Sequence, residues 1–251
     1  MSVENKVFIV TGGCSGLGKA TAEHLGSFPG VKVAVFDLDV SEEVKVASDR
    51  LLKLKTDVTD GALVRQNVDE VVKKFGKIDA VINCAGIATA GLLIYPKNPK
   101  HEMNAEKMEL TFKVNVMGTF NVMKAYLEQY NKNQWKKGCI VNVASVAAED
   151  GQNGQVAYSV SKGAITGMTL PAARELGAHG VRIVAVMPGI FDTNMSSMMP
   201  DKVMNNLLGS CSLGRFGLPQ EFAMFVEAVL KNEYLTGVNL RIDGGNRLTK
   251  L

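Results

Sequence analysis

Several residue types are scarce in this chain, and each scarcity excludes a class of protein. Proline occurs only 7 times in 251 residues, which rules out a proline-rich linker composition. The histidines and cysteines form no CxxC pair, no HExxH motif and no other metal-ligand spacing, so we expect no metal site and no thioredoxin motif. These residues are His24, His101, His179, Cys14, Cys84, Cys139 and Cys211.

Excess charge and long apolar runs are lacking as well. Lysine and arginine number 28 against 25 acidic residues, whereas nucleic-acid binding usually needs a concentrated basic face. The densest basic stretch, residues 132–137, is interrupted by uncharged residues and is expected to be a solvated helix end. No run approaches the 18 or so apolar residues of a membrane span, and residues 7–10 are too short for a signal peptide core. We therefore expect a protein of a reducing, intracellular compartment.

Short β-branched runs alternate with segments of helical periodicity along the whole chain. The expected strands are residues 6–10, 31–36, 52–56, 80–83, 138–144, 182–187 and 238–242, and the expected helices are residues 17–28, 63–75, 108–130, 158–176 and 222–230. Strands that are apolar on both sides suit a parallel sheet covered by helices. The order predicts an α/β fold with one doubly wound, Rossmann-type parallel sheet of about seven strands and helices on both faces. No break in composition divides the chain, so we expect a single domain over residues 1–251.

Two segments interrupt this alternation, and both follow strands. Residues 90–106 are too long for an ordinary strand–helix loop. Residues 191–217 are rich in methionine and leucine, including Met195, Met198, Met199 and Met204. Open α/β sheets bind ligands at the carboxyl ends of their strands, so we expect a substrate-side insertion at 90–106 and a lid at 191–217. Core packing without a functional role is the alternative for the second segment.

Glycine is abundant, with 25 residues, and four of these fall within residues 11–18. Residues 11–18 lie between the first expected strand and helix, and their GxxxGxG spacing lets backbone approach a pyrophosphate at the helix N-terminus. An acidic residue about 20 positions further on completes this pattern. We expect this turn to hold a dinucleotide through Gly12, Ser15, Gly16, Leu17 and Gly18. A simple tight turn is the alternative.

Asp37 ends the second expected strand, 19 residues after Gly18. A carboxylate there accepts hydrogen bonds from both ribose hydroxyls of adenosine and repels a 2′-phosphate, so we predict NAD rather than NADP. The alternative role for Asp37 is that of a turn former. Asp57 and Val58 follow the third strand, where they could contact the adenine amino group and ring; the sequence alone leaves this open.

Tyr158 and Lys162 are four residues apart, on one face of an expected helix. A cation about 4 Å from the phenol at an effective dielectric of ~20 would stabilise the phenolate by ~4 kcal/mol, which would bring Tyr158 towards neutrality as an acid and base. Ser145 ends the preceding strand, where its hydroxyl could hold a substrate carbonyl oxygen. In isolation the Tyr–Lys spacing favours an exposed helix pair; together with the serine and the glycine turn it favours catalysis.

Taken together, these motifs resemble the short-chain dehydrogenase/reductases over nearly the whole chain. The matching positions are residues 11–18 and 83–86, Asn115, Ser145, Tyr158, Lys162, Pro188 and Gly189. The resemblance implies catalysis by Ser145, Tyr158 and Lys162, with Asn115 supporting a proton relay to solvent. It further implies that the cofactor lies against Cys84, Ala85, Gly86, Tyr158, Lys162, Pro188, Gly189 and Thr193. Cys84 replaces a usual asparagine; it is expected to be an inert thiol, with reactivity as the alternative.

Residues 115–122, 144–148, 163–171 and 241–244 resemble a mitochondrial subgroup of that family that oxidises L-3-hydroxyacyl-CoA with NAD. This implies Gln155, Ser145 and Tyr158 as substrate contacts, a homotetramer, and a mitochondrial location, with cytoplasm as the alternative because no presequence is evident. Lys97, Lys100 and His101 would then meet CoA phosphates or merely be solvated. Steroids or other secondary alcohols are alternative substrates, and members of the subgroup also serve as scaffolds in tRNA processing.

Overall fold

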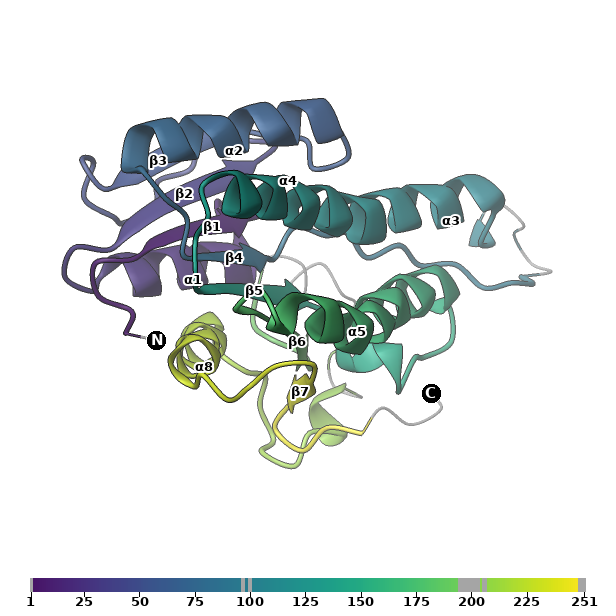
Figure 1. Cartoon of the computed structure of the whole chain (residues 1–251). Coiled ribbons are helices and arrows are strands. Elements are labelled where there is room, and N and C mark those ends of the chain that lie inside the picture. Colours follow the sequence, from purple (N-terminus) through teal and green to yellow (C-terminus); the bar gives the residue numbers. More distant parts are fainter. Residues whose placement is uncertain (1, 96–97, 99–100, 194–203, 205–206, 248–251) are drawn as a thin grey trace.

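Seven parallel strands form one sheet in the order β3-β2-β1-β4-β5-β6-β7 in the computed structural model (Figure 1). The structure describes residues 2–95, 98, 101–193, 204 and 207–247. The strands are β1 (Val7–Thr11), β2 (Lys32–Asp37), β3 (Leu51–Lys55), β4 (Ala80–Asn83), β5 (Gly138–Val143), β6 (Val181–Pro188) and β7 (Asn239–Ile242). The predicted Rossmann-type sheet is confirmed.

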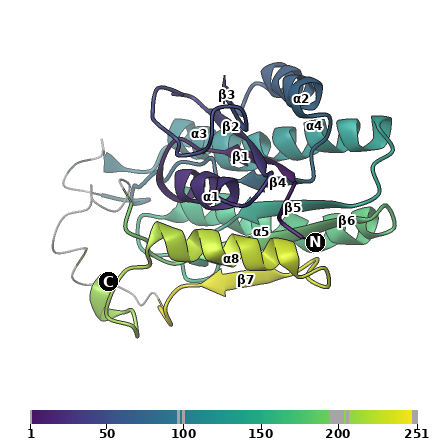
Figure 2. The same ribbon diagram turned by 90° about the vertical axis from the view of Figure 1, so that its left-hand side faces the viewer.

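Helices cover both faces of this sheet, as the apolar strands require. Helices α1 (Gly16–Gly26) and α8 (Pro219–Lys231) pack side by side on one face (Figure 2). Helices α2 (Gly61–Phe75), α4 (Thr119–Lys132) and α5 (Val156–Gly177) cover the other. Strands β1, β4 and β5 are buried along their whole lengths, so the central strands and both helix layers enclose the core.

The strand order reverses between β1 and β4, which pair in parallel from Phe8 opposite Ala80 to Thr11 opposite Asn83. From β1 the chain turns into α1 on one face, whereas from β4 it runs through residues 84–104 to the helices of the other face. Such a switch point leaves a crevice at the carboxyl ends of the two strands, where open α/β sheets bind ligands.

The helix expected at residues 108–130 is longer than predicted and is not uniform. It begins as α3 (Ala105–Phe112), passes through a π-helical segment, η2 (Lys113–Gly118), and continues as α4. The Asn104 side chain accepts a hydrogen bond from the Lys107 N–H, which caps the start of α3. The sequence pattern missed this cap because Asn104 lies inside a polar stretch. The π-helical turn has no evident sequence signal, and such turns often mark functional sites.

The two long segments are anchored near the carboxyl edge by backbone contacts. In the first, Leu92 and Glu102 form a bridge, and the Gly91 N–H donates to the Gly154 carbonyl oxygen just before α5. In the second, Phe191 and Gly217 form a bridge that closes the segment at its base. Lys97, Lys100, Met195, Met198 and Met199, named above, lie outside the described residues.

Among the described residues, no helix is long and apolar enough to cross a membrane. The same part of the chain contains no group of three or more histidine, cysteine or acidic side chains that could hold a metal ion.

Candidate active site

The turn between β1 and α1 requires its glycines. Gly12 and Gly16 have φ angles of 63° and 49°, in the left-handed region that glycine adopts without strain. A Cβ on Gly18 would lie 2.1 Å from the carbonyl oxygen of Gly12, so the backbone packs too closely for any side chain. Helix α1 begins at Gly16, after Ser15, and has no acidic residue in its first turn. Its N-terminal N–H groups therefore offer a favourable place for a phosphate.

The carboxylate of Asp37 at the end of β2 accepts a hydrogen bond of 2.9 Å from the backbone N–H of Cys14. This contact holds Asp37 beside the glycine turn, where the adenosine ribose would follow the pyrophosphate. Lys53, a nearby cation, donates to the carbonyl oxygens of Val40 and Glu42. The arrangement is therefore consistent with recognition of ribose hydroxyls by a carboxylate.

Asp57 and Val58 lie beyond β3, further along the same edge. The exposed Asp57 accepts a hydrogen bond from the Thr59 N–H, whereas Val58 is buried. A Cβ on Gly118 would lie 2.6 Å from a Val58 methyl group, so Val58 packs against the π-helical segment. The roles of these two residues toward adenine remain predictions.

The segment after β4 brings the backbone close to the catalytic candidates. The Ala85 N–H donates to Thr11 Oγ1 over 3.0 Å, which ties this segment to the end of β1. A Cβ on Gly86 would lie 3.1 Å from Asn115 Oδ1 and 3.5 Å from Lys162 Nζ. Burial raises the pKa of Cys84 to about 12, so the thiol stays protonated at neutral pH and is not a reactive thiolate.

Asn115 lies within the π-helical segment, and its side chain is a structural link. Its Oδ1 accepts from the Ile87 N–H, and its Nδ2 donates to the Ile87 carbonyl oxygen and to Ser161 Oγ. The amide thus joins the segment after β4 to α5. The resemblance predicted a proton relay through Asn115, and this side chain is already engaged with protein groups. Ile87 and Ser161 are site-supporting residues that sequence reasoning missed, since neither carries a recognisable motif.

Ser145, Tyr158 and Lys162 come together where β5 ends and α5 begins. Ser145 caps a short 3₁₀ helix, η3 (Val146–Ala148), and its Oγ accepts from the Ala147 N–H over 3.1 Å. Lys162 is buried and donates to the Val143 carbonyl oxygen over 2.8 Å. Its Nζ lies 5.7 Å from the centre of the Tyr158 ring. The Tyr158 phenol, the Lys162 ammonium and the Ser145 hydroxyl are therefore close together.

The expectation that Lys162 lowers the Tyr158 pKa is wrong for this arrangement. Burial raises the pKa of Tyr158 above its ordinary value, and a hydrogen bond with Ser145 only partly opposes this shift. The ammonium lies over the aromatic ring and bonds to a carbonyl oxygen, so burial dominates. Burial also lowers the pKa of Lys162 to about 8. At neutral pH, Tyr158 is therefore a protonated phenol, suited to donate a proton to a carbonyl oxygen.

The remaining candidates lie at the end of β6, in the segment after it and just before α5. Pro188 ends β6, and the Gly189 N–H donates to the Ile242 carbonyl oxygen. Thr193 lies against the glycine turn, since a Cβ on Gly16 would be 3.7 Å from the Thr193 methyl group. Gln155 precedes α5, and its side chain accepts from the Gln152 N–H, which closes its own turn. The structure thus gives Gln155 a local role, and its contact with substrate stays a prediction.

The buried lysine gives the first testable prediction. Between about pH 8 and 10.5 the folded protein loses the Lys162 proton while the unfolded chain keeps it, so the free energy of unfolding should rise with pH. Relative to Lys162→Met, the wild type should gain about 3 kcal/mol across this interval. Urea unfolding at several pH values measures the difference. Lys73→Met, at an exposed position of α2, is the control, and a pH-independent difference for Lys162→Met would contradict the assignment.

Comparisons with known proteins agree with this geometry. Residues 6–203 match the family model described as short chain dehydrogenase. The chain is 41% identical to 3-hydroxyacyl-CoA dehydrogenase type-2 of Drosophila melanogaster, over 98% of this chain and 99% of that protein. It is 34% identical to the 3-oxoacyl-[acyl-carrier-protein] reductase FabG of Thermotoga maritima, over 98% and 99% of the two chains.

A solved structure shows the same architecture. A short-chain dehydrogenase/reductase from Serratia marcescens is similar with a TM-score of 0.85 and 29% sequence identity, over 98% of this chain and 99% of that one. The resemblance inferred from the motifs is confirmed. The chain therefore belongs to the short-chain dehydrogenase family of oxidoreductases.

Proposed function

We propose that this oxidoreductase interconverts L-3-hydroxyacyl-CoA and 3-ketoacyl-CoA with NAD as its cofactor. The observation that carries the proposal is the convergence of Ser145, Tyr158 and Lys162 beside a glycine turn that suits a dinucleotide. The two relatives described above are named for acting on 3-hydroxyacyl or 3-oxoacyl thioesters. A shared chemistry at the third carbon of an acyl thioester supports this substrate class.

In the proposed mechanism, a bound nicotinamide would supply the hydride chemistry, while the protein positions the substrate oxygen and moves its proton. Ser145 donates a hydrogen bond to the substrate oxygen. During reduction Tyr158 donates its phenolic proton to that oxygen, and during oxidation the phenolate form of Tyr158 accepts the hydroxyl proton. Lys162, charged below about pH 8, would bind the nicotinamide ribose. Asn115 links the segment after β4 to α5, the helix that carries Tyr158 and Lys162.

The insertion at residues 90–106 supports an apolar substrate. Leu93 and Ile94 are largely exposed, and the neighbouring Gly91 is bonded to the turn just before α5. An acyl chain or a steroid would both suit such side chains, so a hydroxysteroid dehydrogenase activity is the second candidate. A mitochondrial location and a scaffold role in tRNA processing follow from the subgroup resemblance alone, and that scaffold role would not require Tyr158.

The substrate proposal is tested by kinetics with acetoacetyl-CoA, a 3-ketosteroid and 2-methyl-3-hydroxybutyryl-CoA. We expect the highest kcat/KM with a CoA thioester. Tyr158→Phe should lower turnover at least ~10²-fold because the proton donor is lost. Tyr234→Phe, at a side chain that is 97% exposed, is the matched control and should keep wild-type turnover. A preference for the steroid would favour the second candidate, and near-normal turnover of Tyr158→Phe would contradict the mechanism.

The cofactor proposal depends on Asp37. Asp37→Ala removes the carboxylate that would repel a 2′-phosphate, so the ratio of kcat/KM for NADH over NADPH should fall at least ~10-fold. Initial rates with both cofactors measure this ratio. Asp49→Ala changes an exposed carboxylate in the turn before β3 and should leave the ratio unchanged. An unaltered ratio in Asp37→Ala would mean that Asp37 does not select the cofactor.

Exposed apolar side chains on two neighbouring helices support a homo-oligomer, proposed as a tetramer. They lie on the α3–α4 helix and the adjacent α5: Leu110, Phe112, Met117, Phe120, Val156, Val160 and Leu170. Exposed apolar patches of this kind commonly mark interfaces.

This proposal predicts that Phe120→Glu, at a side chain that is 48% exposed, will dissociate the assembly into smaller species. Light scattering coupled to gel filtration gives the mass directly. Gln66→Glu places the same carboxylate on the exposed side of α2 and should leave the mass unchanged. A wild-type protein that elutes as a monomer would refute the proposal.

A further inference from the structure

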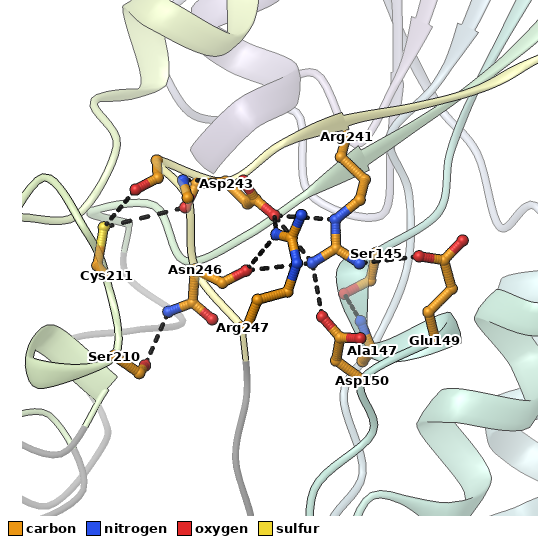
Figure 3. Close-up of polar contacts among 12 residues, drawn as sticks. Ser145, Ala147, Glu149, Asp150, Ser210, Cys211, Arg241, Asp243, Asn246 and Arg247 are labelled. Atoms are coloured by element: carbon orange, nitrogen blue, oxygen red, sulfur yellow. Dashed lines mark hydrogen bonds and ion pairs between the residues drawn. The ribbon is translucent and has the colours of Figure 1, made fainter.

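Arg241 in β7 lies at the centre of a cluster of ion pairs (Figure 3). Its guanidinium donates to Glu149 over 2.8 Å, to Asp150 over 2.6 Å and to Asp243 over 2.9 Å. The Arg241 side chain is only 19% exposed, so these contacts are partly shielded from water. Arg241 therefore joins the last strand of the sheet to residues 149 and 150.

Both of these acidic residues belong to the loop that carries Ser145. They follow the 3₁₀ helix that Ser145 caps, and the N–H groups of Glu149 and Asp150 both donate to the Val146 carbonyl oxygen. The Ala148 N–H donates to the Ser145 carbonyl oxygen, so the loop is a single hydrogen-bonded turn. A restraint on the two carboxylates is therefore transmitted over a few residues to Ser145.

A second arginine in the cluster lacks this connection. Arg247 shares Asp243 with Arg241, but its side chain is 66% exposed, and its described contacts are with Asp243 and Asn246. Arg241 is thus distinguished by its reach to Glu149 and Asp150. The pair provides a variant and a matched control within one cluster.

The same C-terminal segment also contacts the lid. Asn246 Nδ2 donates to Ser210 Oγ over 2.9 Å, and the Cys211 thiol donates to the Gly244 carbonyl oxygen (Figure 3). Residues 241–246 therefore contact both the Ser145 loop and residues 210 and 211, near the C-terminal end of the expected lid.

We propose that Arg241 is a positioning residue that fixes the loop bearing Ser145, so that the Ser145 hydroxyl is held in place to orient the substrate oxygen. Arg241 itself touches none of the reacting groups and acts through Glu149 and Asp150. This inference rests on the proposed function for the role of Ser145, whereas the restraint on the loop is independent of the substrate.

The kinetic test is a double-mutant cycle with Ser145→Ala. Arg241→Met should lower kcat at least ~10-fold while the Kd for NADH stays within twofold of the wild type. In the Ser145→Ala background the same substitution should cost less than twofold, because the hydroxyl that it positions is absent. Arg247→Met should keep kcat within twofold. An equal loss in both backgrounds, or no loss from Arg241→Met, would overturn the proposal.

A second measurement separates this inference from the proposed function. Amide hydrogen exchange over residues 145–151 needs no substrate, and Arg241→Met should accelerate it whereas Arg247→Met should not. If Arg241→Met fails to fold, Glu149→Gln combined with Asp150→Asn keeps the side-chain shapes and should reproduce the faster exchange. Unchanged exchange in the folded variant would overturn the inference even if acyl-CoA turnover is confirmed. Faster exchange without acyl-CoA turnover would refute only the proposed substrate.

Discussion

The parallel pairing of β1 with β4 is the constraint on which the site depends. It places Thr11 opposite Asn83, and the Ala85 N–H then bonds to the Thr11 hydroxyl. Because the chain leaves these two strands toward opposite faces of the sheet, a crevice is expected between their carboxyl ends. The glycine turn borders this crevice on one side, and the residues that follow β4 border it on the other. The cofactor and catalytic candidates are arranged around this one pairing.

Burial controls the protonation of the groups next to the crevice. It raises the pKa of the Cys84 thiol and of the Tyr158 phenol, and it lowers the pKa of the Lys162 ammonium. All three shifts favour the uncharged form, as desolvation requires. Lys162 keeps its charge near neutral pH although it is buried, and its bond to the Val143 carbonyl oxygen supplies a partner. The site therefore combines two neutral proton donors with one cation that is easily discharged.

Sequence reasoning reached the fold and the main catalytic candidates because both depend on local patterns. Strand and helix periodicity predicted the sheet, and the four-residue spacing placed Tyr158 and Lys162 on one helix face. The Tyr158 pKa could not be predicted, since it depends on burial and on where the ammonium points in three dimensions. Asn115 was recognised by position, but its link to Ile87 and Ser161 joins distant segments. The Arg241 cluster was missed for the same reason, as about 90 residues separate its partners.

The bridge between Phe191 and Gly217 has a consequence for how this enzyme class diversifies. Phe191 is buried against Phe222 of α8, so both ends of the intervening segment are anchored to the core. Changing the length of a loop whose ends are already held together costs little closure entropy, about 0.6 kcal/mol for each doubling. A change in the length of the segment between the two anchors therefore adds little to the entropic cost of folding. Residues of this segment that bond back to the core, such as Ser210 and Cys211, are constrained in a way that its length is not.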